Sequence, residues 1–292
     1  MEHSGWLSWA KLATAALLIG MSKTGFPGAG ILAIPLVTMV TPALLPDHPE
    51  PAKASTGLVL PMLIVGDIFA VAFYRRHAVW KHLVKLIPFA ALGIVGGYLV
   101  MHLLKDAQVK PIIGSILLAM LVMSWLRQWS LRRTGGTAEA SSPLPAEVEA
   151  APARGWVARA EAIGRGWWFP VCMGLLAGVT TMMANAAGPI MIIYLTAMRL
   201  PKNEFLGTGA WYFLLLNCFK VPFSGDLGLI TPASIQINLC ALPVIVVGAL
   251  LGVRVLKIIP EKGFAIVVQA LAAVGAAWLA FGALIPKGGL LK

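Results

Sequence analysis

The 292-residue sequence predicts an all-α polytopic membrane protein, built from two inverted repeats of about five membrane segments each. The first observation behind this prediction is composition: 59% of the residues are hydrophobic, 12% are charged, and the mean hydropathy is +0.83. A soluble domain with a polar surface does not hold this balance, so lipid must be the solvent for most side chains. The other two observations are a series of ten apolar segments and a duplicated set of small residues.

The apolar segments divide evenly between the two halves of the chain. Those of the first half lie at residues 7–21, 31–45, 54–73, 83–104 and 109–126, and those of the second half at residues 168–183, 190–198, 205–219, 235–259 and 264–285. A helix needs about 20 residues to cross the hydrocarbon core of a bilayer. The second segment of each half is too short for this. We expect the first two segments of each repeat to be short, broken or re-entrant.

Residues 131–166 differ in character from both halves. Gly, Ser and Pro alternate there with acidic residues such as Glu139 and Glu147, a composition typical of a flexible solvated linker. We therefore divide the chain into a first transmembrane repeat (residues 1–130), a cytoplasmic linker (residues 131–166) and a second transmembrane repeat (residues 167–292).

The two halves repeat each other at small residues. Nine residues separate Gly20 from Gly30, and nine also separate Gly178 from Gly188. Two further sets match in the same order: Pro88, Gly93 and Gly97 with Pro243, Gly248 and Gly252, and Thr56-Gly57 with Thr208-Gly209. Three sets in one order indicate a duplication, and an odd number of spans per repeat makes the repeats inverted.

Basic residues predict how the chain is oriented. The net charge is +11, from 23 Lys and Arg against 12 Asp and Glu. Cytoplasmic loops carry an excess of Lys and Arg, which places the basic clusters at residues 75–85 and 127–165 inside the cell. The loop with Asp47 and Glu50 and both termini then face the periplasm. We expect the basic residues to contact anionic lipid headgroups, and we expect no nucleic-acid partner because no basic and aromatic patch lies outside the membrane.

Two equivalent motifs, residues 20–30 and 178–189, mark the predicted binding site. In inverted-repeat transporters the substrate lies near the midplane, where interrupted helices expose backbone N–H and C=O groups. Pro27 and Pro189 break the helix and leave unpaired N–H groups at a new helix start, which attracts anions. The alternative is a tight helix crossing in which the small residues serve only packing. The candidate substrate-binding residues are Ser22, Thr24, Gly25, Gly28 and Gly30 in the first motif and Thr180, Thr181, Asn185 and Gly188 in the second.

Charged and amide side chains within the apolar segments are further candidates. Lys23 needs an anionic partner or a wet cavity at mid-membrane, unless it extends to the cytoplasmic headgroups. Asn217 and Lys220 share a helix face and are also candidates for substrate binding, with Lys220 at the outer membrane surface as the alternative. Asp67 is the candidate for proton coupling, since a buried carboxylate can take up and release a proton. A permanent ion pair of Asp67 with Lys23 or Lys53 is its alternative.

The sequence favours neither an enzyme nor a metalloprotein. Cys172, Cys218 and Cys240 lie in apolar segments without CxxC or Cys/His spacing, so we predict core residues and neither a disulfide nor a metal site. No P-loop pattern occurs, and neither HExxH nor GxSxG is present. We therefore expect no enzymatic activity, no cofactor and no use of a nucleotide.

Three stretches resemble the sulfite exporter TauE/SafE family of bacterial membrane proteins. They are GMSKTGFPGAGILAIP at residues 20–35, GLLAGVTTMMANAAGPIMIIYL at residues 174–195 and NCFKVP at residues 217–222. The likeness covers nearly the whole chain apart from the linker, and it departs from many members at Ala29, where they have glycine. The resemblance implies outward movement of sulfite, thiosulfate or an organosulfonate across the inner membrane.

These features predict a secondary transporter of a small anion that works by alternating access around the paired broken helices. The expected partners are the anionic substrate and membrane lipids, with proton coupling and formation of a homodimer left open. One alternative is a membrane subunit with an accessory or scaffold role, and another is an anion channel.

Overall fold

The computed structural model describes residues 3–25, 30–105, 107–109, 111–112, 115–116, 168–198 and 200–255, which form helices and contain no strand. The first half contains α1 (His3–Thr24), α2 (Gly30–Leu44), α3 (Pro51–Tyr74), the 3₁₀ turn η1 (Arg75–His77) and α4 (Trp80–Leu103). The second half contains α7 (Trp168–Ala184), α8 (Gly188–Ala197), α9 (Lys202–Asp226) and α10 (Pro232–Val255). The predicted all-α class is confirmed for this part of the chain. The predicted linker and tenth segment lie outside it, as does most of the fifth segment.

Helix lengths follow the predicted pattern except at α1. Among the described residues, three stretches are long and apolar enough to cross a membrane: Pro51–His77, Trp80–Leu103 and Pro232–Arg254. The second helix of each half is short, with 15 residues in α2 and 10 in α8. α1 has 22 residues and rises by about 33 Å, so of the three predicted alternatives, short, broken or re-entrant, the first does not hold for this helix. The helix continues past its apolar run because Ser22 and Thr24 near its end are buried within the protein.

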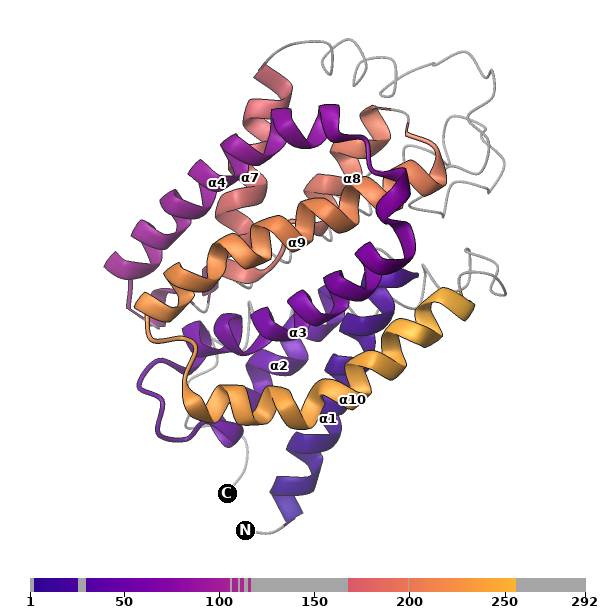
Figure 1. The fold of residues 1–292 in the computed structure, drawn as a ribbon. Helices are drawn as coiled ribbons and strands as arrows, with labels where there is room; N and C mark the ends of the chain where they lie inside the picture. Colours follow the sequence, from indigo (N-terminus) through magenta and orange to yellow (C-terminus); the bar gives the residue numbers. More distant parts are fainter. Residues whose placement is uncertain are drawn as a thin grey trace, which may run out of the picture.

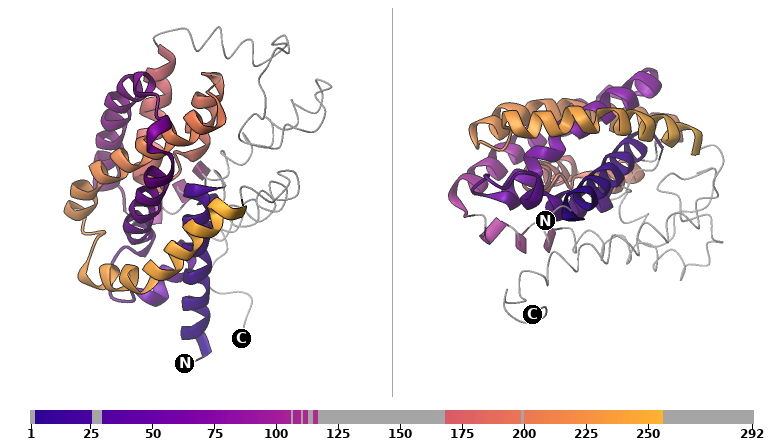
Figure 2. Two further views of the ribbon diagram at one scale, coloured as in Figure 1. Left: turned by 45° about the vertical axis from the view of Figure 1, so that its right-hand side comes forward. Right: turned by 90° about the horizontal axis from the view of Figure 1, so that it is seen from below.

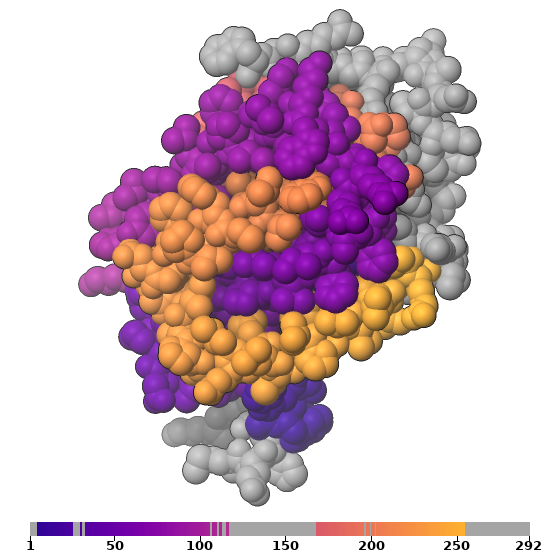
Figure 3. All heavy atoms as spheres, viewed as in Figure 1, coloured from indigo at the N-terminus to yellow at the C-terminus, as the bar shows by residue number. Residues whose placement is uncertain are grey.

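The helices pack as two bundles, each with its own core. The first bundle consists of α1, α2, α3 and α10, and its core includes Ile19, Leu58 and Ile245. The second bundle consists mainly of α4, α7, α8 and α9, with Ile94 and Tyr194 in its core. Figure 1 shows the second bundle above the first, and Figure 3 shows α10, α3, α9 and α4 in that order across one face. The fourth helix of each half therefore packs with the first and third helices of the other half.

The exchanged helices cross their neighbours at matched glycines. α1 crosses α10 where Gly20 meets Gly248, and α7 crosses α4 where Gly178 meets Gly93. Figure 2 shows α10 against α1 from two further directions. A Cβ atom on Gly20 or Gly178 would overlap a backbone carbonyl oxygen of the opposing helix. Both crossings therefore depend on the absence of a side chain at these positions.

The three cysteines lie on the outer surface of the helices. Cys172, Cys218 and Cys240 are all exposed, so the prediction that they are core residues is wrong. A membrane helix is apolar on the side that faces lipid as well as on the side that faces protein. Apolar neighbours in the sequence therefore do not show which way a cysteine points.

Candidate functional site

The break between α7 and α8 is a left-handed turn at Asn185. This residue has a φ of 51°, which asparagine tolerates better than most other non-glycine residues. Its N–H donates to the Thr181 carbonyl oxygen at 3.0 Å, and the Ala186 N–H donates to the Thr180 carbonyl oxygen at 3.3 Å. These bonds close the last turn of α7. α8 then begins at Gly188, and its first N–H groups have no acceptor in a preceding turn of the same helix.

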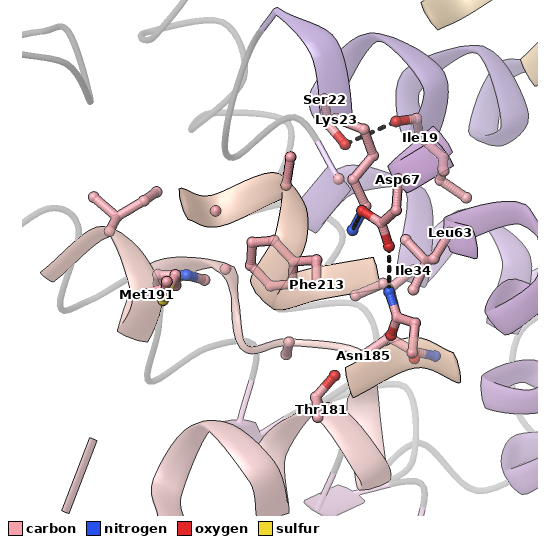
Figure 4. A pocket seen from close by; sticks show the side chains of 18 of the residues that line it. Ile19, Ser22, Lys23, Ile34, Leu63, Asp67, Thr181, Asn185, Met191 and Phe213 are labelled. Atoms are coloured by element: carbon pink, nitrogen blue, oxygen red, sulfur yellow. Dashed lines mark hydrogen bonds and ion pairs between the residues drawn. The ribbon is translucent and has the colours of Figure 1, made fainter. Parts of the chain in front are cut away.

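Both helix breaks border one cavity of about 110 Å³. One water molecule needs roughly 15 Å³ by this measure, so the cavity has room for an anion of several heavy atoms. Its polar residues are Ser22, Lys23, Asp67, Thr181, Asn185 and Asn217, and the starts of α2 and α8 contribute Gly30, Gly188 and Pro189. The rest of the wall is largely apolar, with Phe213 and Met191 among its residues (Figure 4).

Lys23 and Asp67 form an ion pair in the wall of the cavity (Figure 4). The Lys23 Nζ lies 2.8 Å from Asp67 Oδ1, and the two side chains are 12% and 0% exposed. The Asn217 Nδ2 donates to Asp67 Oδ2 at 2.6 Å, and the Lys23 Nζ lies 4.3 Å from the centre of the Phe213 ring. Lys23 therefore points into the protein and not toward the headgroups. Of the two lysines considered for Asp67, the partner is Lys23, while Lys53 pairs with a different carboxylate.

Lys220 is buried behind the cavity wall, with an exposed fraction of 1%. Its Nζ donates to the Thr181 carbonyl oxygen at 2.9 Å, to Thr181 Oγ1 at 3.3 Å and to Asn185 Oδ1. The Asn185 Nδ2 donates in turn to the Thr56 carbonyl oxygen at 2.9 Å, which connects the break to α3. The alternative of Lys220 at the membrane surface is therefore wrong. Lys220 contacts two residues of the cavity wall without being part of that wall.

The cavity brings together Ser22, Lys23, Gly30, Asp67, Thr181, Asn185, Gly188 and Asn217 from the predicted set. Thr24 instead donates to the Ala249 carbonyl oxygen at 2.7 Å, and Gly25 packs against Gly252. Both serve the contact between α1 and α10, which is the packing role given above as the alternative. Thr180 donates at 2.7 Å to the carbonyl oxygen four residues earlier and does not line the cavity. The predicted residue Gly28 lies outside the described residues.

Phe213 is a cavity residue that the sequence motifs did not indicate. It lies four residues before Asn217, and residues four apart share a helix face, so this spacing was the available signal. Gly209, another four residues earlier, also lines the cavity. Within the described ranges, no group of three or more His, Cys, Asp or Glu side chains is placed to hold a metal ion.

A family model described as sulfite exporter TauE/SafE matches residues 12–279. The chain belongs to this family. The match begins within α1 and extends past the end of α10, so every residue that lines the cavity of this TauE/SafE protein lies within it. No significant match was found among the curated proteins or among the solved structures. Membership of a transporter family, and three helices of the described part that are long and apolar enough to span, make the TauE/SafE chain a multi-pass membrane protein.

Proposed function

We propose that this protein is a secondary transporter that exports a small sulfur-containing anion, such as sulfite, thiosulfate or an organosulfonate, across the bacterial inner membrane. The observation that carries the proposal is that residues from both helix breaks line one and the same cavity. In this arrangement the linker lies in the cytoplasm and both termini lie in the periplasm. The TauE/SafE family supports the sulfur-containing substrate.

Buried charge supports an anionic substrate. Lys23, Lys220 and Asp67 lie in or behind the cavity wall, which places two cations against one carboxylate. An uncompensated charge in a low-dielectric site is costly, so the excess positive charge favours binding of an anion. The starts of α2 and α8 add partial positive charge through their free N–H groups.

The two bundles support alternating access. α3 and α9 lie side by side where the bundles meet, and both contribute cavity residues (Figure 1). The exchange of α4 and α10 is what two inverted repeats related by a two-fold axis would produce. Movement of one bundle against the other would expose the cavity to each side of the membrane in turn. The inside-negative potential favours anion exit by about 2.3 kcal/mol per charge for each 100 mV.

Asp67 is the proposed site of proton coupling. Lys23 and Asn217 contact its two carboxylate oxygens. An anion that binds Lys23 would compete with Asp67 for the ammonium group. The carboxylate, once released from Lys23, would then take up a proton.

The proposal is tested by uptake of radiolabelled sulfite into liposomes that contain the purified protein, with Gly188→Ala and Gly225→Ala as matched variants. Neither added methyl group would meet another atom within 4 Å. Only Gly188 lines the cavity, where the methyl group would keep an anion from the start of α8. We expect sulfite uptake to saturate and to be inhibited by thiosulfate and sulfoacetate. The uptake rate should be about tenfold lower in Gly188→Ala and unchanged in Gly225→Ala.

Other outcomes would overturn the proposal. Uptake that does not saturate with sulfite concentration would indicate a channel. No uptake of any tested anion by the wild-type protein would indicate an accessory subunit. Equal uptake by Gly188→Ala and the wild type would place the binding site elsewhere.

A further inference from the structure

The ammonium group of Lys220 is fully used by two residues of the cavity wall. It has three hydrogens to donate and cannot accept. Its three contacts are the carbonyl oxygen of Thr181, Thr181 Oγ1 and Asn185 Oδ1, all of them neutral oxygens. No carboxylate of the described residues lies within ion-pair distance of Lys220. Each of these three oxygens therefore already accepts a hydrogen from Lys220.

The bonds from Lys220 determine which hydrogens of Thr181 and Asn185 remain free to donate to a ligand. A hydroxyl oxygen that accepts from an ammonium group directs its own hydrogen away from it, so the Thr181 hydroxyl is left as a donor. The Asn185 side chain has its oxygen bound to Lys220 and one Nδ2 hydrogen bound to the Thr56 carbonyl oxygen, which leaves the second Nδ2 hydrogen. Thr181 and Asn185 both line the cavity beside Gly188, whose helix start presents backbone N–H groups.

We propose that Lys220 makes the α7–α8 break a donor-only subsite for a fully deprotonated oxyanion. Lys220 is a positioning residue in this subsite, because it sets the direction of the hydrogen bonds of Thr181 and Asn185 without touching the anion. The inference rests on the proposed function, since the subsite would hold the transported anion.

The subsite selects against oxyanions that carry a proton. Sulfate and sulfonates present only acceptors, whereas hydrogen phosphate would direct one hydrogen at a donor and leave a buried group unpaired. Asp67 also lines the cavity, but it belongs to α3 and not to the α7–α8 break, and Lys23 and Asn217 contact its two oxygens. Discrimination would therefore come from proton content rather than from size or charge.

Binding of sulfate and of hydrogen phosphate tests this at mildly alkaline pH, where the two anions have equal charge and similar size. The measurement is the anion-dependent shift of the melting temperature of the purified protein in detergent. We expect the wild type to bind sulfate at least about tenfold more tightly than hydrogen phosphate. In Lys220→Met, a variant of similar side-chain length without charge, the ratio should fall to about one, because Thr181 and Asn185 regain free acceptors.

A second pair of variants tests the proposal even if Lys220→Met does not fold stably. Thr181→Val retains Lys220 and its bonds to the Thr181 carbonyl oxygen and Asn185 Oδ1, and it removes the cavity hydroxyl, so it should lose most of the selectivity. Thr180→Val makes the same change one residue away, at a hydroxyl that bonds within its own helix, and should keep the selectivity. If Lys220→Met is unstable, it should bind both anions more weakly by the same factor. The result for Thr181→Val then decides the test.

The outcomes separate the subsite from the transporter. Equal binding of both anions by the wild type, or selectivity retained in Thr181→Val, would overturn the subsite. Sulfite uptake into liposomes is measured in parallel on the same preparations. Selective binding without uptake would support the subsite and contradict the proposed transport function. Uptake without selective binding would support the transport function and contradict the subsite.

Discussion

At the scale of single residues, three buried charges explain why an anion suits this cavity. Lys23 is balanced by Asp67, while Lys220 is bonded only to neutral oxygens of Thr181 and Asn185 among the described residues. A buried carboxylate that shares a cation with the substrate is the simplest way to link a proton to an anion. The residues that would form the proposed link therefore lie on α1, α3 and α9.

We predict that Asp67→Asn removes the response of transport to a pH gradient. The charged groups around this position are Lys23 on α1 and Lys220 on α9, and neither is a carboxylate. Sulfite exchange at equal pH should persist, while uptake driven by an imposed pH gradient should be lost. Asp226→Asn is the control, because Asp226 is an exposed carboxylate that bonds Tyr98 at the end of α9.

A gradient response retained in Asp67→Asn would mean that Asp67 only holds α1 against α3. The loss of one partner from a buried pair costs about 3 kcal/mol, so this variant also requires a stability check. The double variant Lys23→Met/Asp67→Asn removes the unpaired cation. It should recover part of the lost free energy of unfolding without recovering the gradient response.

Residue spacing predicted much of the site, and side-chain direction accounts for the rest. The paired motifs brought Ser22, Thr181 and Asn185 to one cavity because each motif marks a helix break. The inward direction of Lys220 was not predictable, since a lysine near a helix end can extend to either side. The direction of Lys220 depends on its contacts with Thr181 and with Asn185 in its left-handed turn, and these residues come close to Lys220 only in the folded chain.

At the scale of elements, close helix crossings hold each bundle together. The short second helices were predictable from length alone, because their apolar runs fall below one membrane thickness. The exchange of α4 and α10 was not, since helices that are apolar on all sides carry no periodic signal for their neighbours. The matched glycines indicated close helix crossings, but they did not show which helix packs against which.

We predict that Gly178→Ala destabilises the protein by about 2 kcal/mol, because the added Cβ would overlap the Ala90 carbonyl oxygen and push α7 away from α4. Gly96→Ala, elsewhere on α4, is the matched control. Its Cβ would approach nothing closer than 4.0 Å, and alanine favours the helix by up to about 1 kcal/mol. Denaturant unfolding in detergent measures both. Equal stability of the two variants would contradict the tight crossing.

At the scale of the whole molecule, the cavity residues indicate which side is open. Those on α9 run from Phe205 to Asn217, within the first two thirds of this helix, and those on α8 extend to Leu195 near its end. By the positive-inside rule, the basic loop at residues 75–85 predicts that these ends of α8 and α9 lie on the cytoplasmic side. We therefore expect the structure to represent the state that accepts an anion from the cytoplasm.

We predict that a cysteine at Gly209 reacts from the cytoplasmic side. Gly209 lines the cavity, and a Cβ there would meet its nearest atom at an ordinary contact distance of 3.8 Å, so Gly209→Cys should fold. Cys172, Cys218 and Cys240 are first replaced by alanine, which their exposed positions should tolerate within about 0.5 kcal/mol. A membrane-impermeant thiol reagent should then label inside-out vesicles faster than right-side-out ones, and bound sulfite should protect.

Two exposed positions calibrate the orientation in the same background. Arg76→Cys lies in the basic turn after α3 and should react only in inside-out vesicles, whereas Asp47→Cys lies between α2 and α3 and should react only in right-side-out vesicles. The reverse pattern at these two positions would invert the topology. If both control positions react as expected, the orientation of the chain is established independently of the cavity. Reaction of Gly209→Cys only from the periplasm would then show that the cavity opens outward.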